Sequence, residues 1–167
     1  MPSVMLVGER VSSTGVRAAL DAGDLDRASR LLGRPYSISG RVVRGDGLGR
    51  KLGFPTANVQ MKHNRPPLMG IFAVEVAGIG PGPLRGVASL GLRPTVRQQG
   101  APVLEVHLFD HGGESYGRQV RVSFLHKFRD EEKYSDLATL TRQIALDVEN
   151  ARAYFARRDA GAPRKTG

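Results

Sequence analysis

The sequence predicts a mainly β protein in which five or six short antiparallel strands form a small barrel or sandwich. Segments rich in Val, Ile, Leu and Phe recur between about residues 36 and 125, and Gly/Pro clusters such as "GIGPGP" separate them. No segment between them is long enough for a useful helix, which argues against parallel βαβ units. A helical hairpin precedes these strands, and one long amphipathic helix follows them.

The N-terminal part of the chain reads as two short helices joined by a tight turn. Ser13 or Thr14 is the expected N-cap of the first helix, and Gly23 is its expected end. Asp24 then caps the second helix, which ends at Gly33. The two helices therefore form a hairpin in front of the β region.

The β region contains five clear strand candidates. They cover residues 36–43, 70–78, 84–91, 102–109 and 118–125. Each candidate is short and is bounded by residues that favour turns, as expected for consecutive antiparallel strands.

The last regular element is a helix over residues 135–158, with Ser135 as its expected cap. Its apolar residues recur at steps of three and four, so they lie on one face and should pack on the β region. These residues are Leu137, Leu140, Ile144, Val148, Ala151 and Phe155. We expect residues 159–167 to form a disordered tail.

Composition limits the function only loosely. The 167 residues suffice for one domain with a proper core, and the lack of cysteine excludes disulfides and thiolate metal sites. The net charge of +9 suggests a polyanionic partner, but a nucleoside triphosphate satisfies it as well as nucleic acid does. Only 6% of residues are aromatic, which disfavours single-strand binding. No apolar run reaches the roughly 20 residues of a membrane span, so we expect a cytoplasmic protein.

A glycine-rich loop, "RGDGLGRKLGFPTAN" (residues 44–58), is the first candidate for chemistry. Its glycines let the backbone approach a ligand and direct N–H groups at phosphate oxygens, and Arg50 and Lys51 add positive charge. The spacing matches neither a Walker A loop nor a Rossmann fingerprint. A glycine-rich hairpin loop with solvated charges is an equally good interpretation.

Thr56 and Asn58 follow this loop and face the same side if the segment is extended. Their oxygens suit Mg²⁺, which prefers hard oxygen ligands and keeps substrate phosphates and water. The alternative is that Asn58 caps a turn and Thr56 is an ordinary strand residue.

Two further segments carry candidate groups. In "LEVHLFD" (residues 104–110), Glu105 and His107 share one face of a strand, so Glu105 is a candidate general base, although such faces are more often simply exposed to water. The charged segment "FRDEEKYSD" (residues 128–136) is either a lead-in to the last helix or a mobile flap that carries Arg129.

Taken together and in this order, "GFPTAN", "LEVHLFD" and "FRDEEKY" resemble the riboflavin kinase module of prokaryotic bifunctional FAD synthetases. The resemblance covers about residues 36–155. It implies a six-stranded antiparallel Greek-key barrel with a C-terminal helix. It also implies an enzyme that transfers the γ-phosphate of ATP to the 5′-hydroxyl of riboflavin, giving FMN and ADP.

The same resemblance implies roles for individual residues. Thr56 and Asn58 match the pair that positions Mg²⁺ and the ATP phosphates, and Glu105 matches the catalytic carboxylate. Arg129 and Glu131 match a flap that closes over the flavin. The loop residues that match the cover of the nucleotide are Gly45, Gly49, Arg50, Lys51 and Gly53.

Residues 11–36 resemble the closing segment of the FMN adenylyltransferase module that precedes the kinase in these enzymes. The residues that match ATP-binding positions of that module are Ser12, Ser13, Thr14 and Arg17. The His-containing nucleotide motif of that module is absent. We therefore expect no adenylyltransferase activity, and we expect a truncated chain or an isolated kinase domain.

The expected domain division is a remnant of linker helices over residues 1–35 and a kinase barrel with its helix over residues 36–158. We expect a monomer that acts on small molecules and has no nucleic-acid or membrane partner. Two alternatives stay open: a small basic barrel that binds RNA or protein, and a flavin-binding module without catalysis. Convergence of Glu105 with Thr56 and Asn58 in space would favour the kinase.

Overall fold

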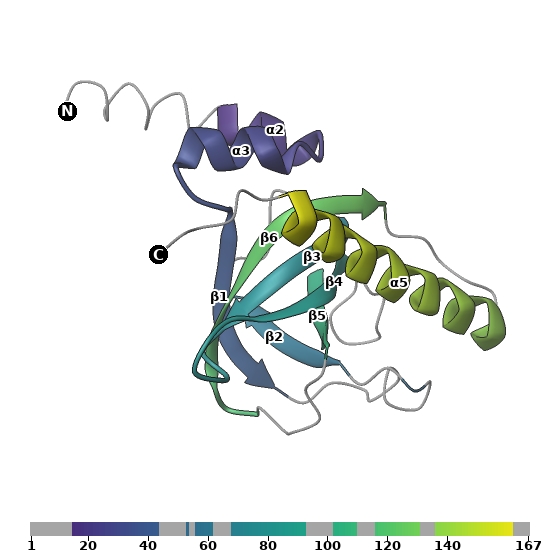
Figure 1. Ribbon diagram of the computed structural model, residues 1–167. Helices are drawn as coiled ribbons and strands as arrows, with labels where there is room; N and C mark the ends of the chain where they lie inside the picture. The colour runs from purple at the N-terminus through teal and green to yellow at the C-terminus, as the bar shows by residue number, and fades with distance from the viewer. Residues whose placement is uncertain are drawn as a thin grey trace, which may run out of the picture.

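A computed structural model describes residues 15–43, 53, 56–61, 68–92, 102–109, 116–130 and 136–161. Its strands close into a barrel in the order β1-β2-β5-β4-β3-β6, and all neighbouring strands are antiparallel (Figure 1). The strands are β1 (Ser37–Val43), β2 (Ala57–Met61), β3 (Gly70–Ala77), β4 (Leu84–Leu92), β5 (Pro102–Leu108) and β6 (Gln119–Arg129). Because β6 returns beside β3 after the consecutive strands β3, β4 and β5, the barrel contains the predicted Greek key.

The structure differs from the strand-by-strand prediction at two places. β2 was not among the five candidates: its five residues alternate between apolar and polar, but the segment is short and Val59 is its only β-branched residue. β6 runs four residues beyond the predicted end at residue 125 and ends at Arg129. Pairing with β3 extends it, with register shifts between Ile71 and Phe72 and between Ala73 and Val74.

The barrel interior is filled by alternate side chains from all six strands. Phe72 and Phe124 lie at its centre as an edge-to-face pair, with ring centroids 5.1 Å apart. The other side chains that are almost fully buried there include Val42, Val74, Leu90, Leu104, Val106 and Val122. The residues between them in each strand consequently point to the outside of the barrel.

The predicted helical hairpin consists of α2 (Arg17–Asp21) and α3 (Leu25–Leu32), which lie at one end of the barrel (Figure 1). Gly23 has φ 78°, and the N–H groups of Gly23 and Asp24 return to the carbonyls of Leu20 and Ala19, which satisfies the end of α2. Asp24 caps α3 through the N–H of Arg27, so this predicted cap is confirmed. Ser13 and Thr14 lie outside the described residues.

The long helix α5 (Leu137–Gly161) crosses the outer face of β3 and β4 (Figure 1). Asp136, rather than the predicted Ser135, supplies the capping carboxylate, which accepts the N–H of Thr139 at 2.7 Å. The helix includes residues 159–161, which were expected in the tail. None of the described helices is long and apolar enough to cross a membrane.

Only the C-terminal half of the predicted apolar face of α5 is buried deeply. Ala151 and Phe155 pack against barrel residues such as Val87 and Phe109. Leu137 is 57% exposed, so its predicted burial is wrong. The helix extends past the barrel edge at its N-terminal end, where no strand lies beneath it (Figure 1).

Candidate active site

Asn58 and Glu105 lie directly opposite each other on β2 and β5. The next pair along the same two strands, Val59 and Leu104, points into the barrel and is buried. Because side chains alternate along a strand, Asn58 and Glu105 both point to the outer face. Directly opposite residues of an antiparallel pair have Cβ atoms about 5 Å apart, so the amide and the carboxylate are neighbours.

The outer face continues from Glu105 across the sheet. Ser89 on β4 is the partner of Glu105 on the side away from Asn58, and Ser89 is in turn paired with Ile71 on β3. Ile71 is paired with Arg129 on β6. We call this set the outer row: Asn58, Glu105, Ser89, Ile71 and Arg129.

The outer row places Glu105 and Arg129 in one line of paired residues, with Ser89 and Ile71 between them. Neighbouring strands are about 4.8 Å apart, so the backbones of Glu105 and Arg129, three strands apart, are separated by roughly 14 Å or less around the curve. Between them, Ile71 is buried in the cluster that the barrel forms with Ala151 and Phe155 of α5.

Thr56 and His107 flank the pair of Asn58 and Glu105. Thr56 directly precedes β2 and has the same alternation as Asn58, and its side chain is half-buried. His107 is two residues from Glu105 on β5, is paired with Val87, and lies 6.1 Å from the ring of Phe109. Three oxygen-bearing side chains, from Thr56, Asn58 and Glu105, are thus gathered on adjacent strand segments.

Of the predicted nucleotide-loop residues, only Gly53 lies in the described part of the chain. Its φ of 91° belongs to the left-handed region that glycine adopts easily, and nothing within 4 Å would meet a Cβ there. This geometry fits an exposed turn just before β2. The predicted residues outside the described part are Gly45, Gly49, Arg50, Lys51 and Glu131.

Arg129 is the last residue of β6 rather than part of a separate loop. Its Nε and Nη2 donate to the two carboxylate oxygens of Asp147 on α5 at 3.0 and 2.8 Å. Gln143, one turn earlier on α5, donates to the same carboxylate at 3.1 Å. The side chain of Arg129 is 22% exposed, so this fork is held at the edge of the core.

Two residues of this region were not singled out in the sequence. The position of Ser89 beside Glu105 could not be predicted, because neither strand alone determines the register between β4 and β5. Asp147 carried a usable signal: it lies three residues after Ile144 and four before Ala151, so helical periodicity places this charge on the apolar face. A charge at such a position implies a buried partner.

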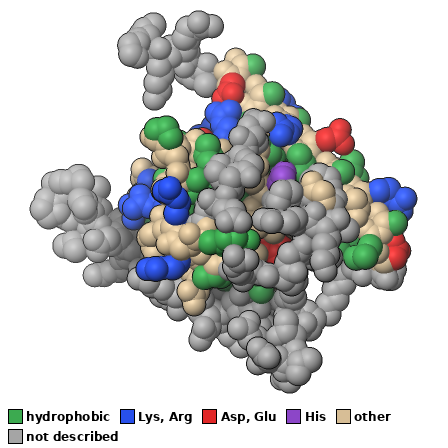
Figure 2. All heavy atoms as spheres, turned by 90° about the horizontal axis from the view of Figure 1, so that it is seen from below, with side chains coloured by type: hydrophobic (Ala, Val, Ile, Leu, Met, Phe, Trp, Pro, Cys, Tyr) green, Lys and Arg blue, Asp and Glu red, His purple; other side chains and the backbone are tan. Residues whose placement is uncertain are grey.

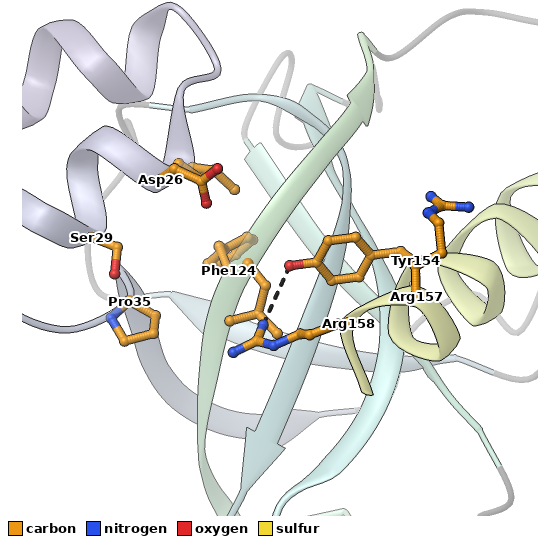
Figure 3. A pocket seen from close by; sticks show the side chains of 9 residues that line it. Asp26, Ser29, Pro35, Phe124, Tyr154, Arg157 and Arg158 are labelled. Atoms are coloured by element: carbon orange, nitrogen blue, oxygen red, sulfur yellow. Dashed lines mark hydrogen bonds between the residues drawn. The ribbon is translucent and has the colours of Figure 1, made fainter. Parts of the chain in front are cut away.

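A cavity of about 440 Å³ lies elsewhere, between α3, β6 and the C-terminal end of α5 (Figure 3). Tyr154, Arg157 and Arg158 line it from α5, and the guanidinium of Arg158 lies 3.3 Å from the hydroxyl of Tyr154. None of the predicted site residues lines this cavity. It is therefore distinct from the outer row.

On the face of the molecule seen from below (Figure 2), the charges of the described residues are spread rather than concentrated. In Figure 2, basic side chains lie in separate small groups around the face seen from below, with acidic side chains between them. Within the described ranges, no group of three His, Asp or Glu side chains could hold a metal ion by itself.

Comparison with known proteins identifies the class to which this barrel belongs. The family model "Flavokinase: Riboflavin kinase" matches residues 32–155. The chain therefore belongs to the riboflavin kinase family, as the sequence motifs implied.

Two bacterial proteins of known sequence that are similar to this chain are longer than it. The chain is 50% identical over 151 residues to the bifunctional riboflavin kinase/FMN adenylyltransferase of Escherichia coli strain K12, covering 89% of this chain and 47% of that protein. It is also 50% identical over 154 residues to the protein of the same description from Pseudomonas fluorescens, covering 92% and 49%. The chain thus spans about half the length of these relatives.

Solved structures support the fold. A structure described as a macrolide-efflux protein from Streptococcus pneumoniae superposes with a TM-score of 0.75 at 34% identity, covering 85% of this chain and 46% of that one. Riboflavin kinase from Trypanosoma brucei superposes with a TM-score of 0.51 at 23% identity, covering 79% and 92%. The second likeness is one of fold alone.

Proposed function

We propose that this chain is an ATP-dependent riboflavin kinase that converts riboflavin to FMN and releases ADP. The observation that carries the proposal is the cross-strand pair of Asn58 and Glu105 on the outer face of a riboflavin kinase barrel. A carboxylate beside an amide, with the hydroxyl of Thr56 nearby, suits a reaction in which a hydroxyl attacks a phosphate.

In the proposed reaction, Glu105 accepts the proton of the riboflavin 5′-hydroxyl. The 5′-oxygen forms a bond to the γ-phosphorus while the bond from that phosphorus to the β,γ-bridging oxygen breaks, and ADP leaves with that oxygen. Glu105 would act through its position beside the attacking hydroxyl. Its half-buried place on a barrel strand would hold it in one orientation.

The residues present fit Mg²⁺ bound together with ATP. Thr56 and Asn58 offer neutral oxygen ligands, which suit a hard ion that shares its coordination with phosphates and water. When bound, the ion would neutralise charge on the transferred phosphoryl group. The residues of the chain would then orient ATP so that the γ-phosphate faces Glu105.

The remaining assignments concern the residues that would contact the flavin ring and those that would cover the nucleotide. Arg129 and Glu131 would contact the flavin, and the glycine loop before β2 would cover the nucleotide. The loop residues assigned to ATP are Gly45, Gly49, Arg50, Lys51 and Gly53. The left-handed turn at Gly53 supports a backbone that can approach phosphate closely.

We further propose a cytoplasmic monomer whose partners are riboflavin and ATP rather than nucleic acid or membrane. The scattered basic side chains on the face seen from below give little support to an RNA-binding surface there (Figure 2). An RNA-binding barrel would also have no reason to place Asn58 opposite Glu105.

The test is a product assay. Purified chain is incubated with riboflavin, ATP and Mg²⁺, and the flavins are separated by chromatography. We expect FMN and no FAD. Binding of riboflavin without FMN would instead support a non-catalytic flavin module, and FAD would contradict the expected lack of adenylyltransferase activity in this chain.

A further inference from the structure

Asp147 is the only charged side chain that is buried among the residues the structure describes; it is 5% exposed. A buried carboxylate is costly unless it is paired and hydrogen-bonded. Asp147 meets this requirement with the two donors of Arg129 and the side-chain amide of Gln143. Its charged partner is thus the guanidinium of Arg129, and Gln143 supplies a third, neutral donor.

The fork between Asp147 and Arg129 fixes the orientation of the guanidinium. Two parallel N–H···O bonds leave a planar group little freedom to rotate. A third bond, from Nη1 of Arg129 to the backbone carbonyl of Asp130 at 3.0 Å, holds the opposite edge of the same group. The guanidinium is thereby held at one end of the outer row, on the strand that carries it.

Fastening α5 to the barrel does not explain the burial of this ion pair. A second bidentate pair, between Arg85 of β4 and Asp159, joins the same helix to the barrel with two bonds of 2.7 Å. The side chains of that pair are 38% and 57% exposed. The helix is thus also attached by an exposed pair and by the packing of Ala151 and Phe155, and the pair of Asp147 and Arg129 is the one in the same row as Glu105 and Asn58.

We propose that Asp147 is a positioning residue of the kinase: it holds the guanidinium of Arg129 in the orientation that contacts riboflavin, with Gln143 fixing the carboxylate. This inference rests on the proposed function. It makes the middle of α5 part of the flavin site, although no residue of that helix was assigned to it. Asp147 acts through Arg129 and does not itself contact the substrate.

The experiment compares two matched substitutions, Asp147→Asn and Asp159→Asn, each of which weakens one bidentate pair between α5 and the barrel. We expect Asp147→Asn to raise the KM for riboflavin by about 10- to 100-fold, with the KM for ATP changed less than about twofold. Asp159→Asn should leave both constants within about twofold. Equal riboflavin KM values for the two variants, after correction for the folded fraction, would overturn the inference.

A double substitution separates positioning from stability. In an Arg129→Ala background, Asp147→Asn should raise the riboflavin KM no further, because there is no guanidinium left to orient. An independent additional increase would contradict the proposal. If Asp147→Asn does not fold, Gln143→Ala decides: a rise of several-fold in the riboflavin KM supports the inference, and an unchanged KM overturns it.

The same samples separate this inference from the proposed function. If the unsubstituted chain makes no FMN, the kinase assignment fails. The variants are then compared by the riboflavin dissociation constant, measured from quenching of flavin fluorescence. Selective weakening in Asp147→Asn would still support the positioning role, whereas an unsubstituted chain that binds no riboflavin would overturn both proposals.

Discussion

Asn58 and Glu105 are cross-strand neighbours although the strands β3 and β4 lie between them along the chain. The pair is set by the inward-facing neighbours Val59 and Leu104, which fix the register of β2 against β5. The packing of the barrel core consequently keeps the pair on the outer face, because a shift of register by one residue would turn both side chains inward.

Glu105→Ala should nearly abolish turnover while the fold stays intact. Loss of a positioned general base reduces rate by about 10²- to 10⁴-fold, and Glu105 is half-buried on the outer face rather than in the core. Turnover is measured by FMN formation, and folding by circular dichroism. Glu75→Ala, on β3 beside Arg85, is the control and should keep near-normal turnover. Near-normal turnover in Glu105→Ala would show that the base is another group.

Thr56→Ala and Asn58→Ala should impair the use of ATP and Mg²⁺ more than riboflavin binding, because their oxygens are assigned to the metal and phosphates. The measurement is the KM for ATP at several Mg²⁺ concentrations, alongside the KM for riboflavin. Gln60→Ala is a matched control, since Gln60 is an exposed amide on the same strand as Asn58 and has the same alternation. A change confined to the riboflavin KM would reassign these two residues.

Phe155→Ala should lower the free energy of unfolding by about 3–5 kcal/mol, because Phe155 is 3% exposed and packs between α5 and the barrel. Leu146→Ala on the same helix should change it by less than about 0.5 kcal/mol, since Leu146 is 50% exposed. Urea unfolding of both variants tests this contrast. A similar decrease in the free energy of unfolding for both variants would mean that the side chain of Leu146 is also buried in solution.

Gly40→Ala should destabilise the barrel by about 1–3 kcal/mol or more. A Cβ at Gly40 would collide with the backbone carbonyl oxygen of Gln60 on β2, which cannot move without breaking the ladder. Gly82→Ala is the control, because nothing lies within 4 Å of a Cβ there. Thermal unfolding of the two variants measures the difference, and an unaffected melting temperature in Gly40→Ala would contradict the close approach of β1 and β2.

The ion pair between Arg85 and Asp159 should give a small stabilisation that is lost in acid. Hydrogen bonding from Arg85, with its charge, lowers the pKa of Asp159 below its ordinary value of 3.8. A carboxyl group with a lowered folded-state pKa contributes stability above its unfolded pKa, and loses it as the pH falls through the lower folded value. The stability difference between the unsubstituted chain and Asp159→Asn should therefore persist near neutral pH and shrink below 3.8. A difference that does not change with pH would exclude this pair as its source.

The sequence alone predicted the features that depend on neighbours in the chain. The caps at Asp24 and Gly33 and most strands follow from local turn chemistry and alternation. Local pattern was insufficient where tertiary neighbours decide whether a side chain is buried. Leu137 has the spacing of a buried residue, yet none of the described strands lies under that end of α5 (Figure 1). The motifs also indicated Asn58 and Glu105 as candidate site residues. Their resemblance to known motifs indicated the family.

Only the tertiary structure decided which of these side chains meet. Closure between β1 and β6, and the register of β2 on β5, depend on the inner faces of all six strands packing together, and no single segment contains that information. The same packing moved Arg129 from an expected loop to a strand end and gave it the buried carboxylate of Asp147. The sequence by itself therefore determined most of the elements, the family motifs and the candidate groups, but not β2. The folded barrel determined their alignment, because side chains distant in sequence are aligned only when the core between them is filled.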